Sequence, residues 1–125
     1  MTGYTGSIEE ITMANRNFRQ VVYTGKHSQL VVMCLQPNEE IGLETHPDTD
    51  QFFRFELGTG KVIINGEEHN VSDGDATVVP AGAQHNVINI SADLPLLLYT
   101  IYSPPQHPDG TIHKTKAEAE AAEKH

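Results

Sequence analysis

Two short stretches of this sequence carry residue types that bind metal ions. The first runs Glu44-Thr-His46-Pro-Asp-Thr-Asp-Gln51, and the second contains His85, which follows a Pro80-Ala-Gly82 turn. Glu44 and His46 lie two positions apart, so on a strand their side chains share one face. A carboxylate, two imidazoles and an amide oxygen form a mixed nitrogen and oxygen set, which suits transition ions better than Ca or Mg. We therefore predict that Glu44, His46, Gln51 and His85 hold one divalent transition ion (Fe, Mn, Ni or Zn).

The ligand types also indicate the chemistry. Two histidines and one carboxylate are the ligand inventory of non-haem iron oxygenases. Gln51 would add a weak neutral ligand or orient a bound water. With one anionic ligand, a divalent ion keeps a net positive charge, so it could polarise a carbonyl or lower the pKa of water. Two alternatives remain: Asp50 replaces Gln51 if the strand register slips by one residue, or the site is vestigial.

The elements that must position these side chains are expected to be short strands. Apolar, β-branched runs alternate with Gly, Asn, Asp and Pro, a pattern typical of many strands joined by tight turns. Asn65-Gly66 is a typical two-residue hairpin turn. We predict strands at 18–23, 29–35, 42–46, 51–57, 61–64, 67–71, 76–79, 85–89 and 96–102.

One helix is predicted, at the C-terminus. Thr115 and Glu118 have the spacing of a capping box, and the Ala- and Glu-rich run after them favours helix. The run has few apolar side chains besides Ala, so we expect this helix to lie on the surface. Residues 103–110, rich in Pro, cannot form regular structure and are expected to extend over the barrel wall. We expect one domain over residues 1–125, with a motif core at about 38–89 and a C-terminal extension at 103–125.

The second stretch resembles a motif of the cupin superfamily. That motif is Gly, five residues, Pro-x-Gly, two residues, His, three residues and Asn, and it is matched in full by Gly74, Pro80, Gly82, His85 and Asn89.

The first stretch resembles the other cupin motif less fully. Family members usually carry His-x-His, then Glu and later Gly, and the corresponding places here hold Glu44, His46, Gln51 and Gly58. The spacing is kept, while Asn38 stands where the motif begins with Gly.

The resemblance implies an all-β double-stranded β-helix, or jelly roll. It also implies a metal-dependent small-molecule enzyme, either an oxygenase or a sugar or keto-acid isomerase or lyase. One fold hosts many chemistries, so the alternative is a non-catalytic cupin that binds or senses a small ligand or a metal. No catalytic residue beyond the metal ligands is assigned. Dimers are common in the family, and we expect a homodimer.

Other histidines receive weaker assignments. His69 and His27 stand among polar residues and are expected on the surface. His107 and His113 flank Pro108-Asp-Gly110, where we favour a structural role over a place in the substrate pocket. Arg54 alternates with Phe53 and Phe55 and should face outward, in an ion pair or a dimer contact.

Composition excludes several partners. The formal net charge of -9 argues against nucleic acid and anionic lipid. No apolar run approaches the roughly 18 residues of a membrane span, and no signal peptide is indicated, so we expect a cytoplasmic protein. The single Cys34, in an apolar run, is expected to be buried.

Overall fold

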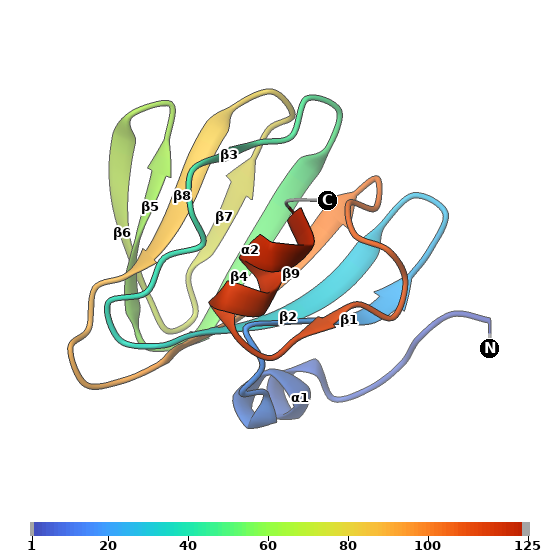
Figure 1. The fold of residues 1–125 in the computed structure, drawn as a ribbon, viewed down its shortest axis with the longest axis horizontal. Coiled ribbons are helices and arrows are strands. Elements are labelled where there is room, and N and C mark those ends of the chain that lie inside the picture. Colours follow the sequence, from blue (N-terminus) through green and yellow to red (C-terminus); the bar gives the residue numbers. More distant parts are fainter. Residues whose placement is uncertain (1, 124–125) are drawn as a thin grey trace.

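Two antiparallel sheets face each other in the computed structural model, which describes residues 2–123 (Figure 1). Within those residues, a six-stranded sheet has the order β10-β1-β2-β9-β4-β7, and a four-stranded sheet has the order β3-β8-β5-β6. This arrangement confirms the predicted jelly roll. The elements are α1 (Ile8–Ala14), β1 (Arg19–Thr24), β2 (Gln29–Leu35), β3 (Glu44–Thr45), β4 (Asp50–Leu57), β5 (Thr59–Ile64), β6 (Glu67–Ser72), β7 (Ala76–Val79), β8 (Gln84–Asn89), β9 (Leu96–Ser103), β10 (Ile112–His113) and α2 (Lys116–Glu123).

The predicted strands are present, and the largest difference in length is at β3. The sequence predicted a strand over 42–46, whereas only Glu44 and Thr45 pair with β8. The ladder is interrupted there because the backbone N–H of Gly42 donates to the side-chain oxygen of Asn86 (2.9 Å), and pairing resumes only as an isolated bridge between Glu40 and Ile88. A side chain has taken the place of a strand partner there.

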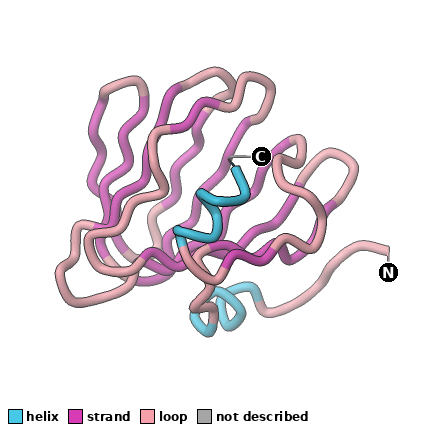
Figure 2. The backbone as a smooth tube through the Cα atoms, viewed as in Figure 1, coloured by secondary structure: helices cyan, strands magenta, loops and turns pink. Residues whose placement is uncertain are grey.

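Helix α1 was not predicted, and it contacts β2, β4 and β9 (Figure 2). It is seven residues long, and Thr12 on it is fully buried. Val32, Cys34 and Leu97 are buried but alternate with the residues of the central core, so they lie on the sheet face that α1 partly covers. The helix therefore shields part of the outer face of the six-stranded sheet.

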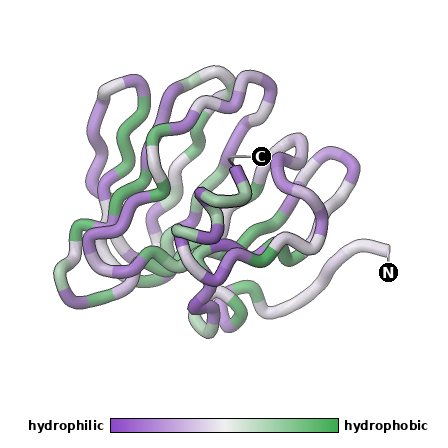
Figure 3. The backbone as a smooth tube through the Cα atoms, in the orientation of Figure 1, coloured by the Kyte–Doolittle hydropathy of each residue, from purple (hydrophilic) through white to green (hydrophobic). Residues whose placement is uncertain are grey.

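The central core lies between the two sheets. The six-stranded sheet contributes large apolar side chains such as Met33, Phe53 and Phe55, and the four-stranded sheet contributes Val62 and Val87. Figure 3 shows that β5 is mostly hydrophobic, whereas its neighbour β6, at the edge of the sheet, is mostly hydrophilic. Charged and polar residues on an edge strand prevent pairing with another chain.

Helix α2 has the predicted capping box. The backbone N–H of Glu118 donates to Thr115 Oγ1 (3.1 Å), and the N–H of Thr115 donates to Glu118 Oε2 (3.2 Å). The helix lies on the surface, as predicted, and Ala119 is its one buried residue, packed in the central core. Its small side chain lets the helix approach the barrel closely.

Asn89 explains why the second motif ends on an asparagine. Its amide group is fully buried and donates to the carbonyls of Leu35 (3.0 Å), Gln36 (3.2 Å) and Leu94 (2.9 Å). Its side-chain oxygen accepts from the N–H of Ser91 (2.9 Å). One side chain thus satisfies backbone groups where β2, β8 and β9 end or begin.

Asn89→Ala should lower the free energy of unfolding by about 2–4 kcal/mol, because buried carbonyls lose their donor. Urea denaturation measures the change, and Asn70→Ala, at an exposed position of β6, should change stability by less than about 0.5 kcal/mol. Equal midpoints for the two variants would contradict the role assigned to Asn89.

Candidate functional site

A backbone hydrogen bond joins the two motifs. The N–H of Gly82, in the loop between β7 and β8, donates to the carbonyl of His46 (2.9 Å). Gly82 has φ +87°, a conformation that favours glycine, and Ala83 N–H closes the turn onto Pro80 O (3.1 Å). The turn therefore sets His85 on its strand and holds it beside His46.

The four predicted ligands come from both sheets and lie together. Glu44 and His85 are directly opposite each other in the β3–β8 pair, so their side chains share a face. Gln51 belongs to β4 of the other sheet, where it is opposite Tyr102. His46, Gln51 and His85 are buried, and the rings of the two histidines are 5.3 Å apart between centroids.

The register of β4 decides between Gln51 and Asp50. Asp50 is exposed, and its Oδ1 accepts from the backbone N–H of Ala81 (2.8 Å). Gln51 is 2% exposed and points at His85. Asp50 thus stabilises the turn before β8 with an exposed side chain, and Gln51 is the residue whose side chain faces the site.

The four side chains form two close pairs. Glu44 Oε2 lies 3.4 Å from His46 Nε2, and Gln51 Oε1 lies 3.1 Å from His85 Nε2. The second pair bridges the two sheets, and Gln51 is held in turn by donating from Nε2 to Thr100 Oγ1 (3.0 Å).

The contact between His85 and Gln51 brings two acceptors together. His85 Nδ1 lies 3.1 Å from the carbonyl of Ala83, which can only accept, so Nδ1 carries the proton. In the neutral ring Nε2 is then unprotonated, and it faces the amide oxygen of Gln51. Two apposed lone pairs repel each other unless a cation or a proton lies close to both, or the amide rotates to present its N–H.

The ligand separations test the fit to such an ion. Two ligands bound at about 2.1 Å lie about 3.0 Å apart in octahedral and about 3.4 Å apart in tetrahedral geometry. The measured 3.1 and 3.4 Å agree with these values. However, no group of three or more His, Cys, Asp or Glu side chains within residues 2–123 is arranged to hold an ion. Each of the two ligand pairs is thus spaced to hold a divalent ion, and the four-ligand site stays a prediction.

Burial changes the pKa of the first pair. It lowers the pKa of His46, and His85 and Arg19 lower it further, so the neutral imidazole that binds metals is favoured. Burial also raises the pKa of Glu44, although the positive charge of Arg19 acts in the opposite direction. A cation held beside Glu44 would favour its ionised form.

A cavity of about 650 Å³ opens beside the first pair. Glu44 and His46 line it, together with residues from β1, β10, α2 and the loop before β10. The structural role favoured for His107 and His113 was incomplete, because both line this cavity. They reach it because residues 104–111 are irregular and pass beside the barrel opening. A volume of this size accommodates a small organic molecule.

Sequence reasoning missed two residues of this region, Arg19 and Tyr102. Both share a strand face with core residues, Arg19 with Val21 and Tyr102 with Leu98 through Thr100. Period-two alternation placed them on the inner face, so the signal was present. Tyr102 OH lies 3.2 Å from His107 Nε2, and burial raises the pKa of Tyr102 to about 12. The hydroxyl therefore keeps its proton and can donate to His107.

The histidines assigned to the surface are exposed, as predicted. His69 lies 3.2 Å from Glu67, and His27 stands in the turn between β1 and β2. Arg54 and Glu56 form the predicted ion pair (3.3 Å) on the face opposite Phe53 and Phe55.

The pKa of His107 is lowered to about 3, first by burial and then by Arg19. The unfolded chain, with an ordinary histidine, binds this proton more readily, so stability should fall as the pH drops from about 6.5 towards 3. His107→Gln should reduce the fall in urea midpoint between pH 7 and pH 4.5. His27→Gln, at an exposed position, is the control. An identical pH dependence in wild type and both variants would contradict a buried, neutral His107.

Sequence and structure comparisons agree on the family. The cupin domain model matches residues 31–102. The chain is 50% identical to the uncharacterized protein YrkC of Bacillus subtilis over 94% of its length, and 43% identical to the uncharacterized protein L612 of Acanthamoeba polyphaga mimivirus over 87%. It spans 66% and 70% of those two proteins. The crystal structure of BH2720 from Bacillus halodurans superposes with TM-score 0.92 and 46% identity, over 94% of this chain and 93% of that one. With the motif positions and the two facing sheets, these matches establish that the chain belongs to the cupin family.

Proposed function

We propose that this cupin is a metal-dependent enzyme acting on a small organic molecule, with Glu44, His46, Gln51 and His85 as the metal ligands. The observation that carries the proposal is the buried apposition of His85 Nε2 and Gln51 Oε1 at 3.1 Å. A cation between these acceptors would turn a repulsive contact into a favourable one. The adjoining cavity, which Glu44 and His46 also line, offers room for a substrate.

Three of the four proposed ligands are supported by a further contact or by their environment. The carbonyl of Ala83 fixes the tautomer of His85, and Thr100 fixes the amide of Gln51. Such supporting contacts orient ligands before an ion binds, which favours affinity. Burial keeps His46 neutral and therefore able to bind a metal.

The neighbouring groups would bind and orient the substrate. When bound, a divalent ion supplies Lewis-acid chemistry, or one-electron chemistry if it is iron. Tyr102 and His107 form a neutral hydrogen-bonded pair, and His107, the member that lines the cavity, can contact hydroxyl or carbonyl groups without adding charge. The buried barrel wall behind them excludes water from one side of the site.

Purified wild-type protein should contain close to one transition ion per chain, and His85→Ala should retain less than about a tenth of it. Elemental analysis after gel filtration measures both. His69→Ala removes an exposed histidine that pairs with Glu67 and should keep the wild-type content.

Circular dichroism of His85→Ala separates loss of the ligand from loss of the fold. Wild type that stays free of metal after loading with Fe, Mn, Ni and Zn in turn would contradict the proposed site.

The class of reaction should follow from which metal ion supports turnover. If the enzyme is an oxygenase, the iron-loaded protein should consume dioxygen with a substrate, and the zinc-loaded protein should not, because zinc has no redox chemistry. If it is an isomerase or lyase, zinc or manganese should support turnover as well as iron does. An oxygen electrode and product analysis across a panel of hydroxy and keto acids distinguish these results.

Non-catalytic ligand binding is the second candidate. It is favoured because, within residues 2–123, the carboxylate and imidazole donors do not already converge as a group of three. Tight ligand binding without turnover in a metal-free protein would support it over the enzyme.

A further inference from the structure

Arg19 is the charged group whose environment the proposed metal site leaves unexplained. It is the first residue of β1 and is 2% exposed, yet its side chain lines the cavity with Glu44 and His46. Burying a full charge is costly unless strong partners surround it. The partners of Arg19 therefore indicate what the cavity is built to hold.

Apart from a side-chain hydrogen bond with Tyr102, the contacts of Arg19 are long or incomplete. Its Nη1 lies 3.4 Å from His113 Nδ1 and 3.9 Å from Glu123 Oε1. Its Nε is buried without a hydrogen-bond partner in the described part of the chain. The guanidinium also lies 5.3 Å from the ring centroid of Phe18. A guanidinium pairs best with a carboxylate that accepts two parallel hydrogen bonds, and residues 2–123 supply no contact of that kind.

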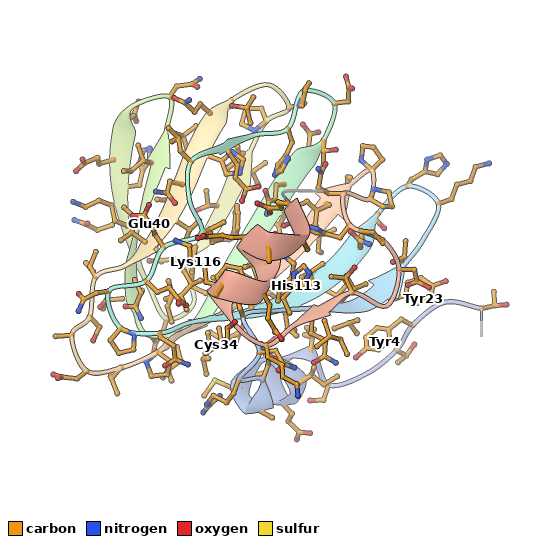
Figure 4. All side chains as sticks on the ribbon, viewed as in Figure 1. Tyr4, Tyr23, Cys34, Glu40, His113 and Lys116 are labelled. Atoms are coloured by element: carbon orange, nitrogen blue, oxygen red, sulfur yellow. The ribbon has the colours of Figure 1, made fainter. Side chains whose placement is uncertain are left out.

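Glu123 is a weak substitute for such a partner. It lies at the end of α2, its side chain is 59% exposed, and 3.9 Å is the outer limit of an ion pair. Figure 4 shows His113 beside α2, the helix that carries Glu123. A carboxylate at this distance on an exposed helix can be displaced at little cost, because exposed ion pairs contribute little.

The charges around the cavity indicate the sign of the ligand's charge. Two carboxylates, Glu44 and Glu123, share the cavity with one guanidinium. A divalent ion held by Glu44 would keep one positive charge, and Arg19 adds a second opposite a displaceable Glu123. An anion matches this balance, and the planar fork of the guanidinium favours a carboxylate.

We propose that the cavity binds a small carboxylic acid whose carboxylate pairs with Arg19 and displaces Glu123, which lies at longer range. The rest of such a ligand would extend towards His46 and His107, which line the same cavity. This inference rests on the proposed function for what happens to the ligand, and it adds the chemical class of that ligand.

Lactate and lactamide provide a matched pair of probes, because they differ mainly in charge. Titrations of the metal-loaded, ¹⁵N-labelled chain should give lactate at least about tenfold tighter binding than lactamide, as expected for charge-assisted hydrogen bonds. Inorganic phosphate is the third probe. Equal affinities for lactate and lactamide, or tighter binding of phosphate than of lactate, would overturn the proposal.

Two variants locate the carboxylate. Glu123→Gln removes the internal competitor and should tighten lactate binding about two- to fivefold, the contribution of an exposed ion pair. Glu120→Gln is the matched control on the same helix, since Glu120 is 56% exposed and pairs with Lys116 instead. Equal effects of the two substitutions would refute the role of Glu123. Arg19→Gln should abolish the preference for lactate over lactamide, and if it fails to fold, the Glu123 comparison decides.

A metal-free sample separates this inference from the proposed function. After chelation and desalting, lactate preference that still depends on Glu123 supports carboxylate binding at Arg19, even if no metal is found in the native protein. A metal-loaded protein in which lactate binding is unaffected by Glu123→Gln and Arg19→Gln refutes the inference and leaves the metal site standing.

Discussion

The hydrogen bond from the N–H of Gly82 to the carbonyl of His46 is the interaction on which the site depends. It fastens the turn before β8 to the segment that follows β3, so two stretches far apart in sequence are fixed side by side. Asp50 adds a second bond to the same turn through Ala81. Because these contacts involve backbone groups and a residue outside the site, the inward-facing side chains are free for ligand binding.

The barrel interior divides into an apolar region and a polar end. Phe53, Phe55 and Val87 fill the space between the sheets, whereas Gln51 and His85 bridge the sheets by a polar contact. Buried polar groups in this position are tolerated because Thr100 and Ala83 satisfy their remaining hydrogen bonds. Packing against the apolar core also fixes these side chains, as a binding site requires.

The C-terminal segment converts this polar end into a cavity. Residues 104–111 bring His107 to Tyr102, and α2 places Glu123 near Arg19. Ala119 anchors the helix in the core, so the cavity wall is part of the folded domain. None of the described helices is long and apolar enough to cross a bilayer. The family and the fold are established, and the metal and the substrate are proposals that depend on this one end of the barrel.

The sequence by itself determined the strands, the turns and the four candidate ligands, because alternation and turn residues are local properties. Alternation also carried a signal for Arg19 and Tyr102, but it was not used in assigning the site. The short β3, helix α1 and the docking of Ala119 depended on contacts such as Asn86 with Gly42, which local propensity does not encode. The choice of Gln51 over Asp50, the pairing of His85 with Gln51 and the cavity beside Arg19 were decided only in the tertiary structure. The physical reason is that each of these features arises where the two sheets and a distant segment pack together. The distances between the side chains are set by that packing rather than by their spacing in the sequence.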